Sequence, residues 1–167
     1  MLNRSKLEAI LAANPMPAQL TAAERKRVYR SAAPVNFLLT SKETNNALAI
    51  MEGTAVRGAE PPRHVHQHED ETFIILEGEM DFYIGEQLVT AIAGDVVFLP
   101  RQIPHHFVVK SEYVKNQIII SPGSFDQYFW YLSAPFKEGD KTGSVPPTPE
   151  ELKAWKELVA LFDVTFL

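Results

Sequence analysis

Residues 58–78 read Gly-Ala-Glu-Pro-Pro-Arg-His64-Val-His66-Gln-His-Glu-Asp-Glu71-Thr-Phe-Ile-Ile-Leu-Glu-Gly78. His64 and His66 are two residues apart, so on an extended strand both imidazoles point to the same face, roughly 6.5–7 Å apart at Cα. Glu71 follows a short polar segment in which the chain can curl back before a β-rich run begins at residue 72. The spacing therefore allows two imidazoles and one carboxylate to converge on one point.

A second stretch, residues 94–105, reads Gly-Asp-Val-Val-Phe-Leu-Pro-Arg-Gln-Ile-Pro-His and ends in a further histidine. All five histidines of the chain lie in these two stretches or directly beside them. A lone histidine is usually a packed or solvated side chain, and a His-rich turn can bind metal adventitiously. Two separated motifs that agree with one another favour a specific site instead.

We therefore predict that His64, His66, Glu71 and His105 bind one divalent transition metal. Imidazole suits zinc, copper, iron and nickel, and an added carboxylate also admits manganese. Three or four protein ligands leave positions open for water, oxygen or substrate, as in catalytic metal sites rather than closed structural ones.

The rest of the chain predicts a mainly all-β fold in the middle and helices at the ends. Short apolar runs separated by turn residues are typical of a sandwich or barrel. The expected strands cover residues 36–40, 47–51, 72–76, 80–84, 88–92, 96–99, 106–110 and 113–120.

The first 33 residues are expected to be helical or irregular, because the pairs Ser5/Glu8 and Thr21/Glu24 have capping-box spacing. The basic run at residues 25–27 is most simply a solvated face. At the other end, Thr148-Pro149-Glu150-Glu151 predicts a helix start. An apolar stripe follows it at Leu152, Trp155, Leu158, Val159 and Phe162. We divide this single domain into an N-terminal helical segment (1–33), a barrel (34–123) and a C-terminal helical extension packed on the barrel (124–167).

The aromatic residues at 125–131 allow two interpretations. They can pack on the outside of the barrel or in a dimer interface, or they can wall a substrate mouth. The first is favoured, because aromatic stripes at helical spacing are usually core.

The two stretches resemble the two cupin motifs. The first motif is matched at Gly58, His64, His66, Glu71 and Gly78, and the second at Gly94, Pro100 and His105. The second departs from the family at two positions, with Gln102 where a glycine is usual and Val109 where an asparagine is frequent. The resemblance implies a double-stranded β-helix, or jelly-roll barrel, with N- and C-terminal helices. More loosely, the whole chain is similar to small bacterial single-domain cupins of the quercetin 2,3-dioxygenase-like group, through residues 61–66, 98–100 and 120–125.

This resemblance implies a metal-dependent oxidoreductase, a dioxygenase that acts on a small aromatic or enolic compound. Glu71 would be a metal ligand or the catalytic general base, since a carboxylate beside a substrate hydroxyl can accept its proton. Two alternatives remain open. One is a non-redox isomerase or lyase in which the metal polarises a carbonyl. The other is a module that binds a small molecule without catalysis.

Other polar residues near the motifs have less specific interpretations. His68 is expected to be a solvated loop residue, and His106 to point away from the metal, because adjacent strand residues face opposite sides. Arg63 and Arg101 could hold an anionic substrate group, although surface arginines are common. Candidate pocket walls, each more often plain core, are Phe73, Met80, Phe82, Phe98 and Phe107.

Composition narrows the class of protein. The absence of cysteine excludes a disulfide scaffold and thiolate ligands. A net charge of −5 without a long basic run argues against nucleic acid as a partner. No apolar run is long enough to span a bilayer, and the first residues lack the apolar core of a signal peptide. We expect a cytoplasmic homodimer that acts on a small molecule.

Overall fold

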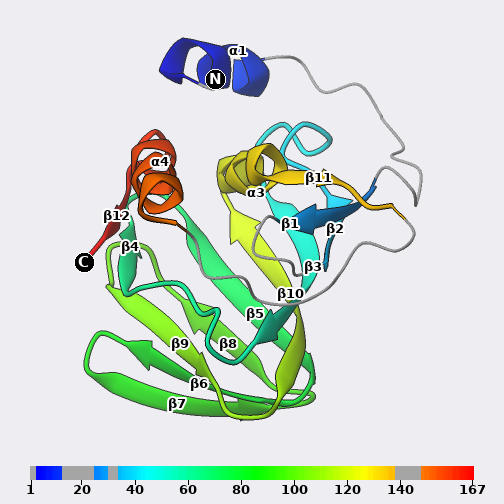
Figure 1. The fold of residues 1–167 in the computed structure, drawn as a ribbon, viewed down its shortest axis with the longest axis vertical. Helices are drawn as coiled ribbons and strands as arrows, with labels where there is room; N and C mark the ends of the chain where they lie inside the picture. Colours follow the sequence, from blue (N-terminus) through cyan, green and yellow to red (C-terminus); the bar gives the residue numbers. More distant parts are fainter. Residues whose placement is uncertain (1–2, 13–24, 30–33, 138–147) are drawn as a thin grey trace.

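The structure is a computed structural model that describes residues 3–12, 25–29, 34–137 and 148–167. Two antiparallel sheets face each other and form a jelly-roll barrel, which confirms the predicted fold class (Figure 1). The larger sheet has the strand order β11 (Ser133–Pro135), β1 (Lys26–Tyr29), β2 (Pro34–Leu39), β3 (Ala49–Val56), β10 (Tyr113–Ser121), β5 (Asp70–Glu77) and β8 (Val96–Leu99). The smaller has the order β12 (Val164–Phe166), β4 (His64–His66), β9 (His105–Val109), β6 (Glu79–Ile84) and β7 (Gln87–Ile92).

Alternation along the strands builds the interior. In β5 the side chains of Glu71, Phe73 and Ile75 are buried, while the residues between them are partly exposed. This is the period of two that places successive side chains on opposite faces of a sheet. The inward side chains form two apolar clusters. One, which includes Phe73, Phe82 and Val97, fills the barrel, and the other lies under the terminal helices.

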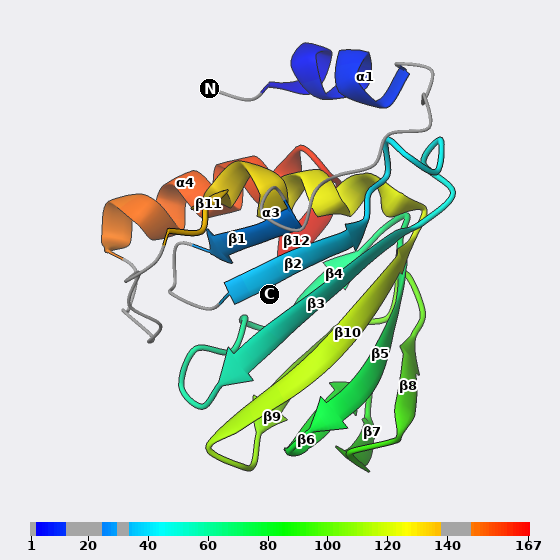
Figure 2. The same ribbon diagram turned by 90° about the vertical axis from the view of Figure 1, so that its right-hand side faces the viewer.

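The helices α3 (Asp126–Leu132) and α4 (Pro149–Ala160) cover one end of the barrel, while α1 (Arg4–Ala12) lies farther out (Figures 1 and 2). A short 3₁₀ turn, η1 (Gly123–Phe125), leads into α3. The predicted start of α4 is confirmed, because the Thr148 hydroxyl accepts a hydrogen bond from the Glu151 N–H in a capping box. Leu158, Val159 and Phe162 of its stripe are buried, but Leu152 is exposed, so the predicted apolar stripe is wrong at its first position.

The ends of the chain contain more β-structure than the sequence predicted. β1 lies within the segment expected to be helical and pairs with both β2 and β11. β12 pairs with β4, the strand that carries the two motif histidines. The basic run is not simply solvated either, because the guanidinium of Arg27 lies 4.2 Å from the centre of the Trp130 ring and donates to the Ser133 carbonyl.

The predicted N-terminal caps fare differently. α1 begins at Arg4, and the side chain of Asn3 accepts a hydrogen bond from the Lys6 N–H. The capping residue is therefore Asn3, two residues before Ser5, the cap that the Ser5/Glu8 spacing predicted. The Thr21/Glu24 pair lies outside the described residues. Among the described residues, we find no helix with the length and apolar character to cross a membrane.

Backbone geometry explains two motif positions. Gly78 has φ +87°, and a Cβ there would collide with the Tyr113 carbonyl, so the position requires glycine. Gln102, which replaces the usual glycine of the second motif, adopts φ 64°. Its N–H donates to the carbonyl of His66 at 2.7 Å. The turn therefore keeps a left-handed geometry without the glycine.

Candidate metal centre

Four predicted side chains meet inside the barrel, at the end nearer the helices. His64 and His66 come from β4, Glu71 is the second residue of β5, and His105 is the first residue of β9. His64 pairs directly with His105 across β4 and β9, while Glu71 faces them from the opposite sheet. All four are buried, and one potential ligand atom from each lies within 4.8 Å of all the others. The structure thus brings together the full set of residues that the two motifs predicted.

Backbone carbonyls fix two of the imidazoles. His64 Nδ1 lies 2.8 Å from the Pro62 carbonyl oxygen, and His105 Nδ1 lies 3.0 Å from the Ile103 carbonyl oxygen. A carbonyl oxygen can only accept, so Nδ1 carries the proton in both rings and Nε2 keeps a free lone pair. Metal-binding histidines are commonly oriented in this way, by a hydrogen bond from the nitrogen that does not face the metal.

The ring nitrogens of His66 and His105 that face the centre have no hydrogen-bond partner. Nε2 of His66 lies 3.8 Å from Glu71 Oε2, and Nε2 of His105 lies 3.3 Å from the same oxygen. Both nitrogens are buried, and neither makes a hydrogen bond. Buried polar atoms without partners are costly. A cation at the centre would satisfy both nitrogens and the carboxylate together, so the donor set fits a metal ion.

The protonation states of Glu71 and His64 suit a metal. Burial alone would raise the pKa of Glu71, but the imidazoles of His66, His105 and His64 outweigh it and hold this pKa at about 2. Burial lowers the pKa of His64 to about 4. Burial also acts to lower the pKa of His66, but Glu71 and Glu69 outweigh it, and the pKa is raised. At neutral pH, Glu71 is an anion and His64 is neutral, which are the forms that bind metal.

One neighbour that the sequence analysis missed is Glu69. Its carboxylate is buried, lies 3.5 Å from His66 Nδ1 through Oε2, and accepts a hydrogen bond from the Ser124 hydroxyl through Oε1. It therefore stands behind His66 on the side away from the centre. The sequence signal was present, since Glu69 lies three residues after His66, but its burial depends on Ser124 from a distant segment.

Aromatic side chains close the site on the helix side. The Phe125 ring meets the His66 ring edge to face, with centroids 4.6 Å apart. The same ring stacks on Tyr128 and meets Phe162. Phe125 therefore packs as core, as the favoured interpretation of residues 125–131 expected, and it also contacts a candidate ligand.

The remaining motif neighbours lie outside the cluster. His68 is exposed and lies 3.2 Å from Asp163 Oδ2, and His106 stacks on Tyr83. Arg63 donates to the Gly85 carbonyl. Arg101 holds Asp70 with two side-chain hydrogen bonds, so both arginines have protein partners.

Of the five candidate pocket walls, three are buried core residues: Phe73, Met80 and Phe82. Phe107 is half-buried and packs against Phe73 and Phe82. Phe98 is 56% exposed, so it is not a core residue, but it does line a surface pocket beside β8. It stands on the outer face of β8, where the alternation of buried and exposed residues places it.

The chain is similar to known proteins over much of its length. Residues 52–115 match the cupin domain family. The chain is 25% identical over 122 residues to a quercetin 2,3-dioxygenase of Bacillus subtilis (strain 168), an alignment that covers 73% of this chain and 36% of that protein. The chain thus spans about a third of the length of this relative.

Two solved structures share the fold. A predicted oxalate decarboxylase from Thermotoga maritima gives a TM-score of 0.54 at 20% identity and covers 62% of this chain and 98% of its own. A Streptomyces PAC13 variant with uridine gives a TM-score of 0.53 at 15% identity and covers 78% and 95%. At these identities, both likenesses concern the fold alone.

Proposed function

We propose that this chain, a small cupin of the quercetinase-like group, is a metal-dependent oxidoreductase that inserts oxygen into a small aromatic or enolic compound. The observation that carries the proposal is the buried cluster of His64, His66, Glu71 and His105, with two unpartnered Nε2 atoms directed at a carboxylate. The similarity to a quercetin 2,3-dioxygenase supports the reaction class.

A first-row transition metal held by these four residues would supply positions at which a substrate oxygen and O₂ can be activated. The protein contributes orientation and the exclusion of water. Backbone carbonyls hold the imidazoles of His64 and His105 in place. One apolar cluster lies on each side of the four candidate metal ligands. A dioxygenase transfers both atoms of O₂ to the substrate, so the reaction requires no external reductant.

The two possible roles of Glu71 differ in the pKa that they require. A general base works best with a pKa near the operating pH. The pKa of Glu71 is about 2, so its carboxylate is a weak proton acceptor and a persistent anion. These properties favour Glu71 as a metal ligand in the resting protein. Proton transfer to Glu71 would then require that the substrate first displace it from the metal.

The test is an oxygen-electrode screen of the purified protein, reconstituted separately with iron(II), manganese, nickel, copper and cobalt. Flavonols, catechols and enediols are the substrates to try. The expected result is uptake of O₂ with both of its atoms recovered in the product, which ¹⁸O₂ labelling would detect. An isomerised product without O₂ uptake would transfer the assignment to the non-redox isomerase. Binding without any product would transfer it to a sensing module.

We further propose that two copies of the chain associate through the outer face of the larger sheet. Figure 2 shows β3, β10, β5 and β8 with no helix in front of them. Ile119 of β10 pairs with Ile50 of β3, and Ile74 of β5 is on the same outward-facing set of side chains. Uncovered apolar side chains on a sheet are a common subunit interface.

A further inference from the structure

A pocket of about 390 Å³ reaches Glu69, whose carboxylate lies beside Nδ1 of His66. It is lined by residues of α1, of the loops that precede β3, β5 and β9, and of the segments that follow β10 and α4. Volumes between about 300 and 1,000 Å³ are usual for small-molecule sites. The four candidate metal ligands do not line this pocket, so it is separate from the metal centre.

Glu69 gives the pocket a buried carboxylate. The residue is only 3% exposed, and its Oε1 accepts a hydrogen bond from the Ser124 hydroxyl at 3.2 Å. Its Oε2 lies 3.5 Å from His66 Nδ1 and makes no hydrogen bond to any described residue. Among the described residues, no arginine or lysine forms an ion pair with Glu69. A buried anion in this situation favours a ligand that carries a donor and a positive charge.

Asn46 supplies a second acceptor beside the same turn. Its backbone carbonyl accepts a hydrogen bond from the Gly123 N–H, and the next residue, Ser124, holds Glu69. The side-chain Oδ1 of Asn46 is buried and also makes no hydrogen bond within the described part of the chain. Buried acceptors without a donor are costly, so both oxygens favour a ligand with several N–H groups.

The cationic side chains of the lining are already paired. Arg101 holds Asp70 through two side-chain hydrogen bonds of 2.7 and 3.1 Å. Arg4 lies 3.2 Å from Asp163 Oδ2, and His68 Nε2 lies 3.2 Å from the same oxygen. An anionic ligand would have to displace one of these carboxylates, whereas a cationic ligand would leave them in place.

The rest of the lining includes an apolar wall. Leu7 of α1 and Phe162 are buried in the cluster under the terminal helices, and Leu161 packs against that cluster. A calcium or magnesium ion takes about six or more oxygen ligands and gains nothing from such a wall. A primary ammonium group has three donors, and an alkyl chain attached to it would cover the apolar side chains.

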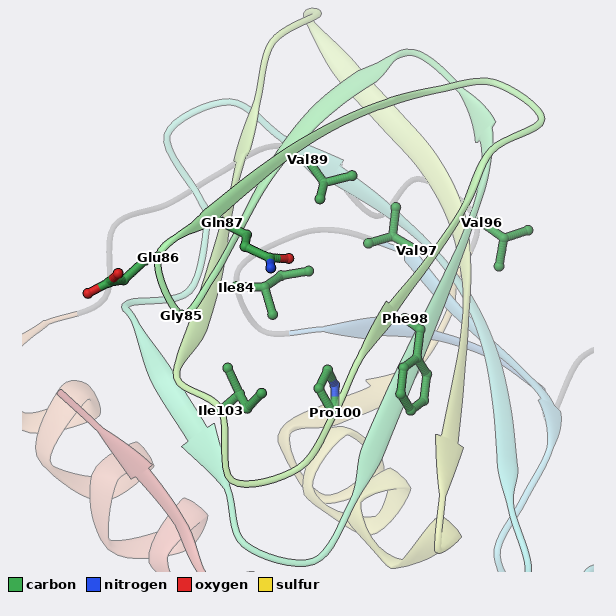
Figure 3. A pocket seen from close by; sticks show the side chains of 10 residues that line it. All are labelled: Ile84, Gly85, Glu86, Gln87, Val89, Val96, Val97, Phe98, Pro100 and Ile103. Carbon is green, nitrogen blue, oxygen red and sulfur yellow. The ribbon is translucent and has the colours of Figure 1, made fainter.

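The larger groove, between β7 and β8, lacks these features. It has a volume of about 730 Å³ and mainly aliphatic walls (Figure 3). Its lining contains two long polar side chains, Glu86 and Gln87, and both are exposed. Water can satisfy these groups, so no buried polar atom of that lining calls for a ligand.

We infer that the 390 Å³ pocket is a binding site for a small aliphatic amine. Glu69 and Asn46 accept hydrogen bonds from its ammonium group, and Leu7, Leu161 and Phe162 contact its alkyl chain. The site is independent of the reaction proposed for the metal centre, since the ligand approaches Glu69 and not the four candidate metal ligands.

The experiment is calorimetric titration of the full chain, as purified, at pH 7 and physiological salt. The probe is n-butylammonium chloride, and 1-butanol is the uncharged probe with the same alkyl chain. One n-butylammonium should bind per chain, and 1-butanol should bind about tenfold or more weakly, because hydrogen bonds to charged groups are the stronger ones. Equal affinities for the two probes, or no binding of n-butylammonium, would overturn the inference.

A matched pair of variants places the site. Asn46→Asp converts a neutral acceptor of the pocket into a carboxylate and should bind n-butylammonium several-fold more tightly. Asn45→Asp is the control, because Asn45 is exposed, does not line the pocket and has a φ of 52°, close to the 63° of Asn46. Asn45→Asp should bind the probe as the unmodified protein does. Equal affinities for the two variants would contradict the assignment of the pocket.

A second pair keeps the test decisive if Asn46→Asp does not fold. Glu69→Gln removes the buried charge and should bind n-butylammonium about tenfold more weakly. Glu79→Gln makes the same change at an exposed carboxylate outside the pocket and should bind the probe normally. Unchanged n-butylammonium binding by Glu69→Gln would overturn the inference.

Discussion

His66 Nδ1 and Glu69 Oε2 lie 3.5 Å apart, and this carboxylate distinguishes His66 from the other two histidines of the cluster. His64 and His105 direct Nδ1 at backbone carbonyls. A backbone carbonyl is neutral and survives any side-chain substitution, whereas Glu69 is charged and can be replaced. The orientation and basicity of one candidate ligand therefore depend on a side chain outside the cluster.

We predict that Glu69→Gln weakens metal binding by about 10- to 100-fold, the usual effect of changing a residue that orients a ligand. Competition with a chromophoric chelator would measure it. Glu79→Gln, at an exposed carboxylate on β6, is the control and should bind metal normally. Equal affinities for the two variants would show that Glu69 does not position His66.

His105 and His106 are adjacent but have different surroundings. His105 is buried within the cluster, while His106 stacks on Tyr83 outside it. His105→Ala should therefore lose most of the bound metal, and His106→Ala should keep it. Elemental analysis of the two purified variants is the measurement. Full metal content in His105→Ala would mean that the second motif does not supply a ligand.

The pH dependence of metal binding follows from His66. Its pKa is raised because Glu71 and Glu69 together outweigh the effect of burial, so His66 keeps its proton to higher pH than a free imidazole, and the metal competes with that proton. Affinity should rise with pH up to this pKa and fall about tenfold per pH unit below it. Glu71, with a pKa of about 2, and His64, with a pKa of about 4, titrate below the pH range in which we expect this change.

Chelator competition between pH 5 and 8 would test this slope. Glu69→Gln offers an internal check, because loss of the Glu69 charge should lower the pKa of His66 and move the pH dependence to more acidic values. Affinity that is independent of pH across the range would contradict the raised pKa.

The sequence predicted the features that depend on only a few neighbouring residues. The period of two in β5, the spacing of His64 and His66, and the Thr148 cap are each visible within a few residues. β1, β11 and β12 have only three or four residues each, too few to show a period. They are strands because partners distant in the sequence bind them, as when Val28 pairs with Ala134.

The same distinction holds for the site. The motifs contain the four cluster residues, but they do not show which neighbouring polar groups are buried. Glu69 and His68 are adjacent in one loop, yet Glu69 is buried against Ser124 and His68 is exposed beside Asp163. The difference in burial between Glu69 and His68 arises from the packing of residues 122–125 and of the C-terminal segment against this loop.

Gln102 provides a test of the altered second motif. Its φ of 64° is unfavourable for side chains with a Cβ, most of all for β-branched ones. Gln102→Val should destabilise the metal-free protein by about 1–2 kcal/mol. Gln102→Gly should change stability by less than about 1 kcal/mol, because relief of strain is offset by a more flexible unfolded chain. Urea unfolding would measure both, and equal stabilities for the two variants would contradict the left-handed turn.

We predict that the protein forms a homodimer through the outer face of the larger sheet. Side chains of Ile50, Ile74 and Ile119 lie on this face, and a second copy of the chain would bury them. Light scattering should give a mass of about twice the 18.8 kDa of one chain at micromolar concentration. Ile119→Glu should shift the protein toward the monomer, because it places like charges across a symmetric interface. Leu88→Glu, on β7 of the other sheet, should remain a dimer, and a monomeric mass for the unmodified protein would reject the interface altogether.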